Sequence, residues 1–322
     1  MFGLSLRDMP RNNGESAVFN QAAAPTSRIR TSLREVKMIK GFCTGALVAF
    51  FVLTGAARAG QDPNWIPPLD QVARDKGEMA FDGCRPKPEN VEPVMCVYGD
   101  PDSDRTVALV GDSHAMQWGP PLIKLAEQRG WRLVTFLRAG CPIAEVKFEP
   151  NCDEWRELAF EEIKDERPGR LIVSTSIARR YPLSLRGRPL SRRGSEKILR
   201  RGMTHTLRRL STLPSLVRHG SRLKLIRDQV TAPFLPPKCL ANHPDDPDAC
   251  GFARHRKFGP GFDVVGATKL GLLPAIDPLQ VLCHPHWCYS AHGHVVIYRD
   301  SDHLTATYTR TLTDWLGSKI SF

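Results

Sequence analysis

The stretch VALVGDSH, residues 107–114, sets the expected fold of this chain, because an apolar run ends there in Gly-Asp-Ser and a helical pattern follows. A short apolar run that ends at a glycine is typical of a buried strand in a parallel sheet. Ser113 is thereby expected on a strand-to-helix turn. A helix N-terminus offers unpaired N–H groups and a positive dipole end, both of which suit an oxyanion. The backbone N–H of Ser113 is the first candidate donor.

A second motif, YRDSDHLT at residues 298–305, supplies a histidine and a carboxylate three residues before it. A serine hydroxyl is a poor nucleophile at neutral pH unless an imidazole takes its proton and a carboxylate orients that imidazole. We therefore predict Ser113 as nucleophile, His303 as general base and Asp300 as the orienting carboxylate. Either motif alone is also explained by an ordinary turn, with Asp112 capping the helix that follows it.

Strand-like and helical patterns alternate along the chain. The expected strands are residues 107–110, 132–136, 171–174 and 223–227, with a fifth near 272–276. The expected helices are residues 121–129, 154–166, 196–213 and 304–316. This alternation predicts a parallel sheet covered on both faces, with a site beyond the carboxyl ends of its strands, where Ser113 falls. The length accommodates one such α/β domain and a small extension.

Three motifs together carry a family resemblance: GDSHAMQW at residues 111–118, Cys141-Pro142, and residues 298–305. They resemble the SGNH hydrolase-like domain found fused to, or beside, membrane acyltransferases that O-acetylate bacterial polysaccharides. The likeness spans residues 62–316. It implies a flavodoxin-like three-layer α/β/α sandwich, the roles given above for Ser113, His303 and Asp300, and O-acyl ester chemistry on carbohydrate without a cofactor. A carbohydrate acyl acceptor and a membrane acyltransferase are the partners it implies, and it favours acyl transfer over hydrolysis.

The expected oxyanion hole departs from the pattern of the SGNH superfamily, which takes further donors from a glycine and an asparagine. Gly140 matches the glycine, so Ser113 and Gly140 are the predicted oxyanion donors. The third segment, LIVSTSI at residues 171–177, holds no asparagine. Ser174, Thr175 or Ser176 are substitutes, although such residues at a strand end are more often ordinary turn residues. The missing asparagine also keeps open a different function, a non-catalytic carbohydrate-binding or scaffolding protein on the same fold.

The N-terminal region predicts export. A short basic start at residues 38–40 precedes an apolar run and the small-x-small pattern Ala57-Arg58-Ala59. The run is shorter than the ~20 apolar residues of a membrane span, so we expect a signal peptide at residues 38–59, with a membrane anchor at 41–56 as the alternative. Residues 1–37 then read as an extension from a misassigned start. The expected location is periplasmic or extracytoplasmic, with an N-terminal extension at 60–104 and the SGNH hydrolase-like domain at 105–322.

The cysteines support the same compartment. Without Cys43 of the signal peptide, eight remain in four near pairs: Cys84 with Cys96, Cys141 with Cys152, Cys239 with Cys250, and Cys283 with Cys288. An even number in an exported chain predicts disulfides, and nearest-neighbour pairing is the simplest arrangement. The competing interpretation is zinc bound by Cys283, His284, His286 and Cys288, with His243, His292 and His294 as further ligands. Because oxidised thiols cannot bind zinc, we predict no metal.

The positive charge is concentrated in one segment. The formal net charge is +11, and residues 179–227 alone carry fifteen basic residues against one acidic residue, Glu196. Tyr181 is the only aromatic residue there, so the stacking platform of a single-strand nucleic-acid binder is missing and we predict no nucleic-acid partner. We expect a solvated helix face. The functional alternative is contact with an anionic polysaccharide or membrane surface.

Overall fold

The computed structural model describes residues 64–177, 181, 183–185, 187–217, 222–254, 261–272 and 275–320. All of them belong to one compact unit, Ala57–Phe322. The predicted signal peptide and the extension at residues 1–37 lie outside the described residues. Within the described ranges, no helix has the length and apolar character that a membrane crossing requires.

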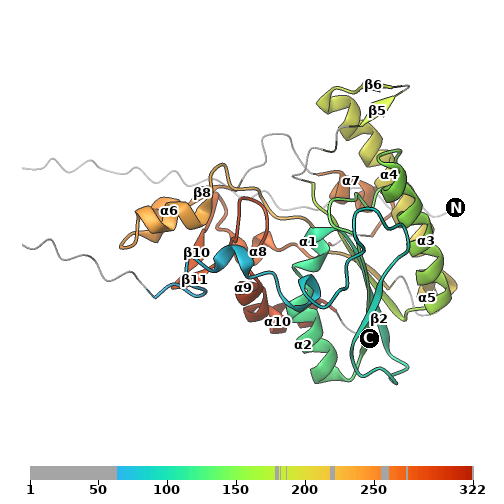
Figure 1. The fold of residues 1–322 in the computed structure, drawn as a ribbon, viewed down its shortest axis with the longest axis horizontal. Coiled ribbons are helices and arrows are strands. Elements are labelled where there is room, and N and C mark those ends of the chain that lie inside the picture. The colour runs from blue at the N-terminus through green and yellow to red at the C-terminus, as the bar shows by residue number, and fades with distance from the viewer. Residues whose placement is uncertain are drawn as a thin grey trace, which may run out of the picture. The chain divides into compact units, whose positions relative to one another are not determined.

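A five-stranded sheet forms the centre of this unit (Figure 1). Its strand order is β1-β3-β2-β4-β7. The strands are β1 (Met95–Gly99), β2 (Thr106–Gly111), β3 (Arg132–Leu137), β4 (Arg170–Ser174) and β7 (Leu223–Leu225). The four strands from β3 to β7 are parallel, as predicted, whereas β1 is an antiparallel edge strand. Of the fifth strand expected near residues 272–276, the described residues form one parallel bridge, between Ile226 and Ile276.

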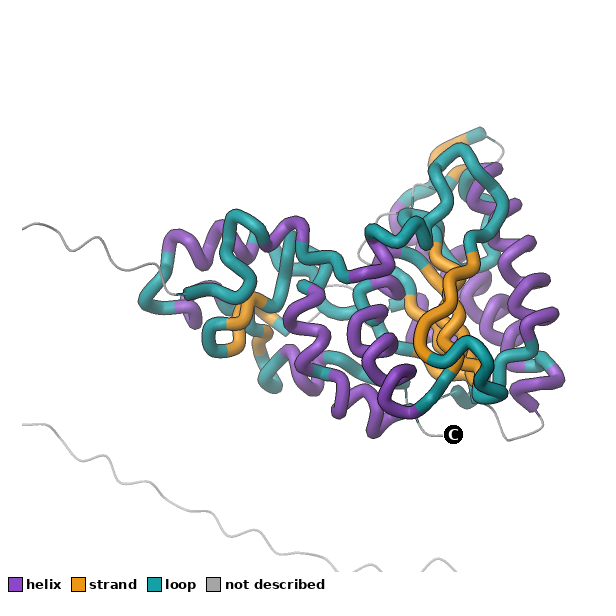
Figure 2. Tube along the Cα trace, turned by 60° about the horizontal axis from the view of Figure 1, so that its bottom comes forward, coloured by secondary structure: helices purple, strands orange, loops and turns teal. Residues whose placement is uncertain are grey.

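The two faces of the sheet belong to two separate hydrophobic cores. Along β2, Val107 and Leu109 point to one core, and Ala108 and Val110 to the other. The first core also contains residues of α2 (Gly119–Arg129), α9 (Ala306–Thr311) and α10 (Thr313–Lys319). The second contains residues of α3 (Pro150–Glu166), α4 (Arg192–Ser211) and α7 (Phe262–Lys269). Helices therefore cover both faces, which confirms the three-layer α/β/α sandwich, and Figure 2 shows the strands between helices.

Capping residues explain where two helices differ from the prediction. The helix expected at residues 304–316 begins only at Ala306, because the Thr305 side chain caps it by accepting from the N–H of Tyr308. It is also divided at Leu312 into α9 and α10. The helix expected at 196–213 begins earlier, at Arg192, because Ser191 caps it by accepting from the N–H of Gly194.

Short elements complete the unit. They are η1 (Val72–Arg74), η2 (Glu78–Ala80), α1 (Ser113–Met116), β5 (Ser184–Leu185), β6 (Arg188–Pro189), α5 (Pro214–Val217), α6 (Pro236–Asn242), η3 (Pro247–Cys250), β8 (Phe252–Ala253), α8 (Leu279–Leu282), β9 (Trp287–Cys288), β10 (Ala291–His292) and β11 (Val295–Val296).

The N-terminal part of the described chain packs against later segments. Trp65 and Val72 lie in a third small core with Leu240 and Val296, and β1 joins the main sheet. The segment expected as an N-terminal extension is therefore packed against later parts of the chain from Trp65 onward.

Eight cysteines are bonded in the nearest-neighbour pairs that the sequence favours. The disulfides are Cys84–Cys96, Cys141–Cys152, Cys239–Cys250 and Cys283–Cys288. The zinc arrangement around Cys283 and Cys288 thereby loses its two thiolate ligands, because both sulfurs are in a covalent bond with each other.

Ion pairs with glutamates of α3 and of the loop before it neutralise part of the basic segment, residues 179–227. Arg209 of α4 pairs with Glu145 at 3.0 Å, Glu157 at 2.7 Å and Glu161 at 3.0 Å. Arg192 and Arg201 of the same helix are exposed. This arrangement agrees with a partly solvated helix face, and contact with an anionic surface stays a prediction.

Candidate active site

Ser113 lies immediately beyond the carboxyl end of the central strand, at a turn that requires glycine. Gly111 has φ +150°, and a Cβ there would lie 1.8 Å from the carbonyl oxygen of Ser174 on β4. The close approach of the two strands therefore excludes any side chain at Gly111. Asp112 then caps α1, with Oδ1 accepting from the N–H of His114 at 2.8 Å. Ser113 is the first residue of α1, where helix geometry leaves the N–H without an intrahelical acceptor.

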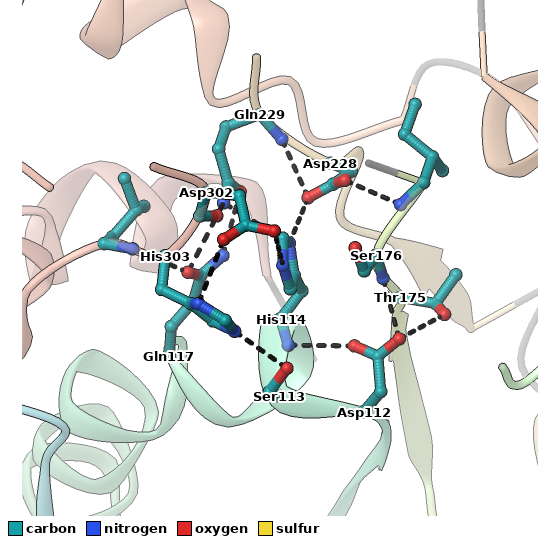
Figure 3. Close-up of polar contacts among 12 residues, drawn as sticks. Asp112, Ser113, His114, Gln117, Thr175, Ser176, Asp228, Gln229, Asp302 and His303 are labelled. Carbon is teal, nitrogen blue, oxygen red and sulfur yellow. Dashed lines mark hydrogen bonds and ion pairs between the residues drawn. The ribbon is translucent and has the colours of Figure 1, made fainter. Parts of the chain in front are cut away.

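The structure brings the three predicted site residues together. His303 Nε2 lies 2.8 Å from Ser113 Oγ, and His303 Nδ1 lies 2.9 Å from Asp300 Oδ2 (Figure 3 shows the contact between Ser113 and His303). The backbone N–H groups of Asp302 and His303 both donate to Asp300 Oδ1, at 3.0 and 2.7 Å. One tight turn before α9 thus orients the carboxylate and the imidazole toward a serine 190 residues earlier.

The surroundings favour an ionised Asp300 and raise the basicity of His303. Burial by itself raises the pKa of Asp300, but the hydrogen bond and the charge of His303 outweigh it and hold that pKa well below its usual range. Burial lowers the pKa of His303, but its hydrogen bonds with Asp300 and Asp302 outweigh burial and raise it above its ordinary value. The pair is therefore suited to accept a proton from a hydroxyl.

Asp302 is a second carboxylate beside the predicted base. Its Oδ1 lies 3.4 Å from His303 Nδ1, and its Oδ2 lies 3.9 Å from His114 Nε2. Asp300 is closer to His303 Nδ1, at 2.9 Å, and accepts backbone hydrogen bonds from the same turn. The distances therefore favour Asp300 as the orienting residue, in line with the prediction.

A pocket of about 270 Å³ opens over Ser113. Its lining residues are Asp112, Ser113, His114, Gly140, Ser176, Tyr181, Asp302 and His303. Gly140, the predicted second oxyanion donor, thus lies on the same pocket as Ser113. Its φ is +77°, a conformation that glycine adopts without strain.

Three hydroxyl residues, Ser174, Thr175 and Ser176, are candidates to replace the absent asparagine as an oxyanion donor. The Thr175 hydroxyl and the Ser176 N–H both donate to Asp112 Oδ2 at 2.8 Å. Ser174 is buried and does not line the pocket, and neither does Thr175. Of the three, only Ser176 lines it. The replacement roles of Ser174 and Thr175 are therefore not supported by their positions.

Sequence reasoning missed a buried polar group behind the nucleophile. His114 is 1 % exposed, and its Nδ1 lies 2.6 Å from Asp228 Oδ1 (Figure 3). Next to Asp228, Gln229 accepts from Gln117 Nε2 at 2.9 Å, and Gln117 in turn accepts from the N–H of Leu304. His114 was visible in the motif after Ser113, but Asp228 follows it by 114 residues and no local pattern marks it.

One cluster of the described residues has the composition of a metal site. Side-chain atoms of His114, Asp302 and His303 lie within 4.8 Å of one another. His303 already contacts Ser113 and Asp300 through its two nitrogens. Asp228 favours the protonated form of His114, and a histidine must be neutral to bind a metal. We therefore assign no metal to this cluster.

Comparisons with known proteins agree with this architecture. The family described as "SGNH domain (fused to AT3 domains)" matches residues 83–316. A solved structure, the periplasmic domain of the lipopolysaccharide acetyltransferase of Salmonella ser. Paratyphi A, is similar with a TM-score of 0.52 and 14% identity. The match covers 81% of this chain and 98% of the Salmonella domain, and at this identity it shows the fold alone. No curated protein matches the sequence. The family match covers most of the chain, and the protein therefore belongs to the family of SGNH domains of the kind fused to AT3 domains.

Proposed function

We propose that this protein is an extracytoplasmic serine O-acyltransferase or acetylesterase that acts on acetyl esters of cell-surface carbohydrate. The observation that carries the proposal is the line of hydrogen bonds from Ser113 Oγ through His303 to Asp300, at 2.8 and 2.9 Å, at the edge of a pocket of about 270 Å³. A nucleophile, a base and an orienting group in this geometry are what acyl transfer through a covalent intermediate requires.

The first half-reaction follows from these contacts. His303 Nε2 takes the Ser113 proton while Oγ attacks the carbonyl carbon of the acetyl ester, and the carbonyl electron pair moves onto its oxygen. The intermediate then collapses. The leaving alcohol receives the proton from His303, and the acetyl group stays on Ser113.

The second half-reaction decides between transfer and hydrolysis. His303 takes a proton from either a sugar hydroxyl or water, and that oxygen attacks the carbonyl carbon of the acetyl-serine. The bond from this carbon to Ser113 Oγ then breaks, and Oγ receives the proton from His303. A bound sugar hydroxyl competes with about 55 M water, and positioning supplies effective molarities far above that value. We favour transfer, because domains of this family are fused to AT3 domains. The SGNH domains that this sequence resembles work beside membrane acyltransferases that acetylate polysaccharides.

Partner and location follow from the same relatives. The Salmonella domain is named as the periplasmic part of a lipopolysaccharide acetyltransferase. This name supports a carbohydrate acyl acceptor and a position outside the cytoplasm for this chain. The fusion of the family to AT3 domains supports a membrane acyltransferase partner. The four disulfides support an oxidising compartment independently.

The test uses the purified oxidised protein with a chromogenic acetyl ester, then with an acetyl donor and candidate acceptor oligosaccharides, beside Ser113→Ala. We expect ester cleavage that Ser113→Ala abolishes, and acetylated sugar together with free acetate. Acetate alone with every acceptor, and prompt deacetylation of acetylated glycan, would assign an esterase. Equal rates for native protein and Ser113→Ala would leave the non-catalytic carbohydrate-binding function instead.

A further inference from the structure

The pocket over Ser113 is lined by a second imidazole, which the two half-reactions do not use. His114 follows the nucleophile on α1 and lines the pocket although its side chain is almost completely buried. Only one of its ring nitrogens has a hydrogen-bond acceptor among the described residues, namely Nδ1, which lies 2.6 Å from Asp228 Oδ1.

Asp228 determines which way the His114 ring is turned. The Asp228 carboxylate accepts hydrogen bonds from the backbone N–H groups of Ile177 at 2.7 Å and Gln229 at 3.0 Å. The backbone N–H of Asp228 donates to the Asp263 carboxylate. The Asp228 carboxylate is thus fixed behind the ring. With Nδ1 toward Asp228, Nε2 is on the side of Asp302, whose Oδ2 lies 3.9 Å away, longer than a hydrogen bond (Figure 3).

Four donors in and just after the segment that lacks the asparagine contact buried carboxylates. Asp112 Oδ2 accepts from the Thr175 hydroxyl, the Ser176 N–H and the Tyr181 hydroxyl, at 2.8, 2.8 and 2.9 Å. The next N–H, of Ile177, donates to Asp228. These four donors stabilise buried carboxylates and are not available to a substrate oxygen.

The charges around the nucleophile make a cationic donor valuable. Asp112, Asp302 and Asp228 face His114 together with His303, whose ring centroid is 4.7 Å from that of His114. An anionic intermediate is unfavourable among so many carboxylates. Burial lowers the pKa of His114, but the charge and hydrogen bond of Asp228, with the charges of Asp112 and Asp302, outweigh burial and raise the pKa to about 9. The raised pKa favours the doubly protonated ring, in which Nε2 as well as Nδ1 carries a proton.

We propose that His114 is a further catalytic residue, whose Nε2–H donates a hydrogen bond to the oxyanion formed at Ser113 and replaces the absent asparagine amide. This inference rests on the proposed function. As Ser113 Oγ bonds to the carbonyl carbon, the electron pair displaced onto the carbonyl oxygen is stabilised by His114 Nε2–H and the backbone N–H groups of Ser113 and Gly140. The His114 proton stays on Nε2 throughout, and the transferred proton is the one on His303.

The test compares His114→Leu, which has no donor, with His114→Gln, which retains a neutral one, in the full chain. Methylboronic acid is the probe, because it forms an anionic tetrahedral adduct on a nucleophilic serine. We expect His114→Leu to lower kcat for a chromogenic acetyl ester by about 10²-fold and to weaken boronate inhibition at least tenfold, with little change in KM. His114→Gln should lose less of both. His243→Gln, at an exposed histidine, is the matched control and should equal the native protein.

Asp228→Asn provides a second route if His114→Leu does not fold. It keeps an acceptor for Nδ1 but removes the charge that raises the pKa of His114. We therefore expect a weaker boronate complex. We also expect kcat to decline on the alkaline side with a midpoint at lower pH than in the native protein. The inference is overturned if His114→Leu or Asp228→Asn leaves kcat and boronate affinity within twofold of native. It is also overturned if Asp302→Asn restores full activity to His114→Leu, because His114 would then act only by neutralising Asp302. A native protein without ester cleavage would instead contradict the proposed function itself.

Discussion

Ser113 and His303 are joined by a contact of 2.8 Å, and the reaction proposed for this site depends on the movement of one proton across it. Asp300 accepts hydrogen bonds from the His303 ring and from two backbone N–H groups of its own turn. The base is therefore oriented by local chain geometry as well as by a charge. Asp302, one residue before the base, is close enough to add charge and is less well placed to orient the ring.

The three site residues are expected to act as a unit. Ser113→Ala and His303→Ala should each lower the rate of acyl transfer by about 10³-fold or more, and the double variant should lose little more. Asp300→Asn should also be severe, and Asp302→Asn mild. The measurement is kcat/KM with a chromogenic acetyl ester for each variant. Equal losses at Asp300 and Asp302 would contradict the assignment of Asp300 as the orienting residue.

The rate is also expected to depend on pH through His303, which must be neutral to accept the Ser113 proton. Hydrogen bonds with Asp300 and Asp302 outweigh burial and raise the pKa of His303 above 6.5. The acidic limb of kcat/KM should therefore have its midpoint above pH 6.5, with activity lost as the pH falls through it. Asp302→Asn removes one of the groups that raise this pKa and should move the midpoint to lower pH. An unchanged midpoint in Asp302→Asn would mean that Asp302 does not influence the base.

At the scale of elements, the position of the nucleophile depends on how closely β2 approaches β4. Gly111 ends β2, pairs with Ser174 of β4, and leaves no room for a Cβ. The next residue, Asp112, then ties α1 to the chain beyond β4 through its two carboxylate oxygens. The turn that presents Ser113 is thus held from two neighbouring strands.

Gly111→Ala is expected to destabilise the fold through both a collision and an unfavourable φ. The added Cβ would meet the Ser174 carbonyl oxygen at 1.8 Å, and we expect a loss of about 2 to 4 kcal/mol in the free energy of unfolding. Gly293→Ala is the matched control, because Gly293 has φ +58° and no atom within 4 Å of an added Cβ. Urea unfolding of the three proteins measures the difference. A Gly111→Ala variant no less stable than Gly293→Ala would show that the strands can separate at little cost.

At the scale of the whole molecule, the four disulfides each close a short local loop, with sequence separations of 12, 11, 11 and 5 residues. None of these four bonds joins two strands of the five-stranded sheet. Cys141–Cys152, for example, closes the connection between β3 and α3, and Cys84–Cys96 joins the N-terminal part to β1. The bonds therefore stabilise local segments around the sheet, whose two faces are buried in the two large cores.

The oxidised protein is expected to contain four intramolecular disulfides and no stoichiometric metal. Its intact mass should increase by the mass of eight hydrogens on full reduction, because each of the four bonds takes up two. Metal analysis of the oxidised protein is the accompanying measurement. Free thiols at Cys283 and Cys288 together with bound zinc would contradict the disulfide at that position.

Several features could be predicted from the sequence because short stretches of chain determine them. The apolar run before Gly111 predicted the central strand and the turn that carries Ser113. The spacing of Asp300 and His303 placed a carboxylate and an imidazole on one turn, and the cysteines of each pair are near neighbours in sequence. Alternating patterns predicted the parallel core of the sheet and the helices on both of its faces.

Only the tertiary structure determined which distant residues meet. His114 and Asp228 are 114 residues apart, and their contact depends on β2 and β7 lying in one sheet with their carboxyl ends at the same edge. The antiparallel edge position of β1 is likewise a result of tertiary pairing, because β1 lies beside β3. A local pattern encodes which residues a turn or strand contains. The partners of a buried polar group are decided by the whole fold, because burial without a partner is costly and the fold alone brings that partner within reach.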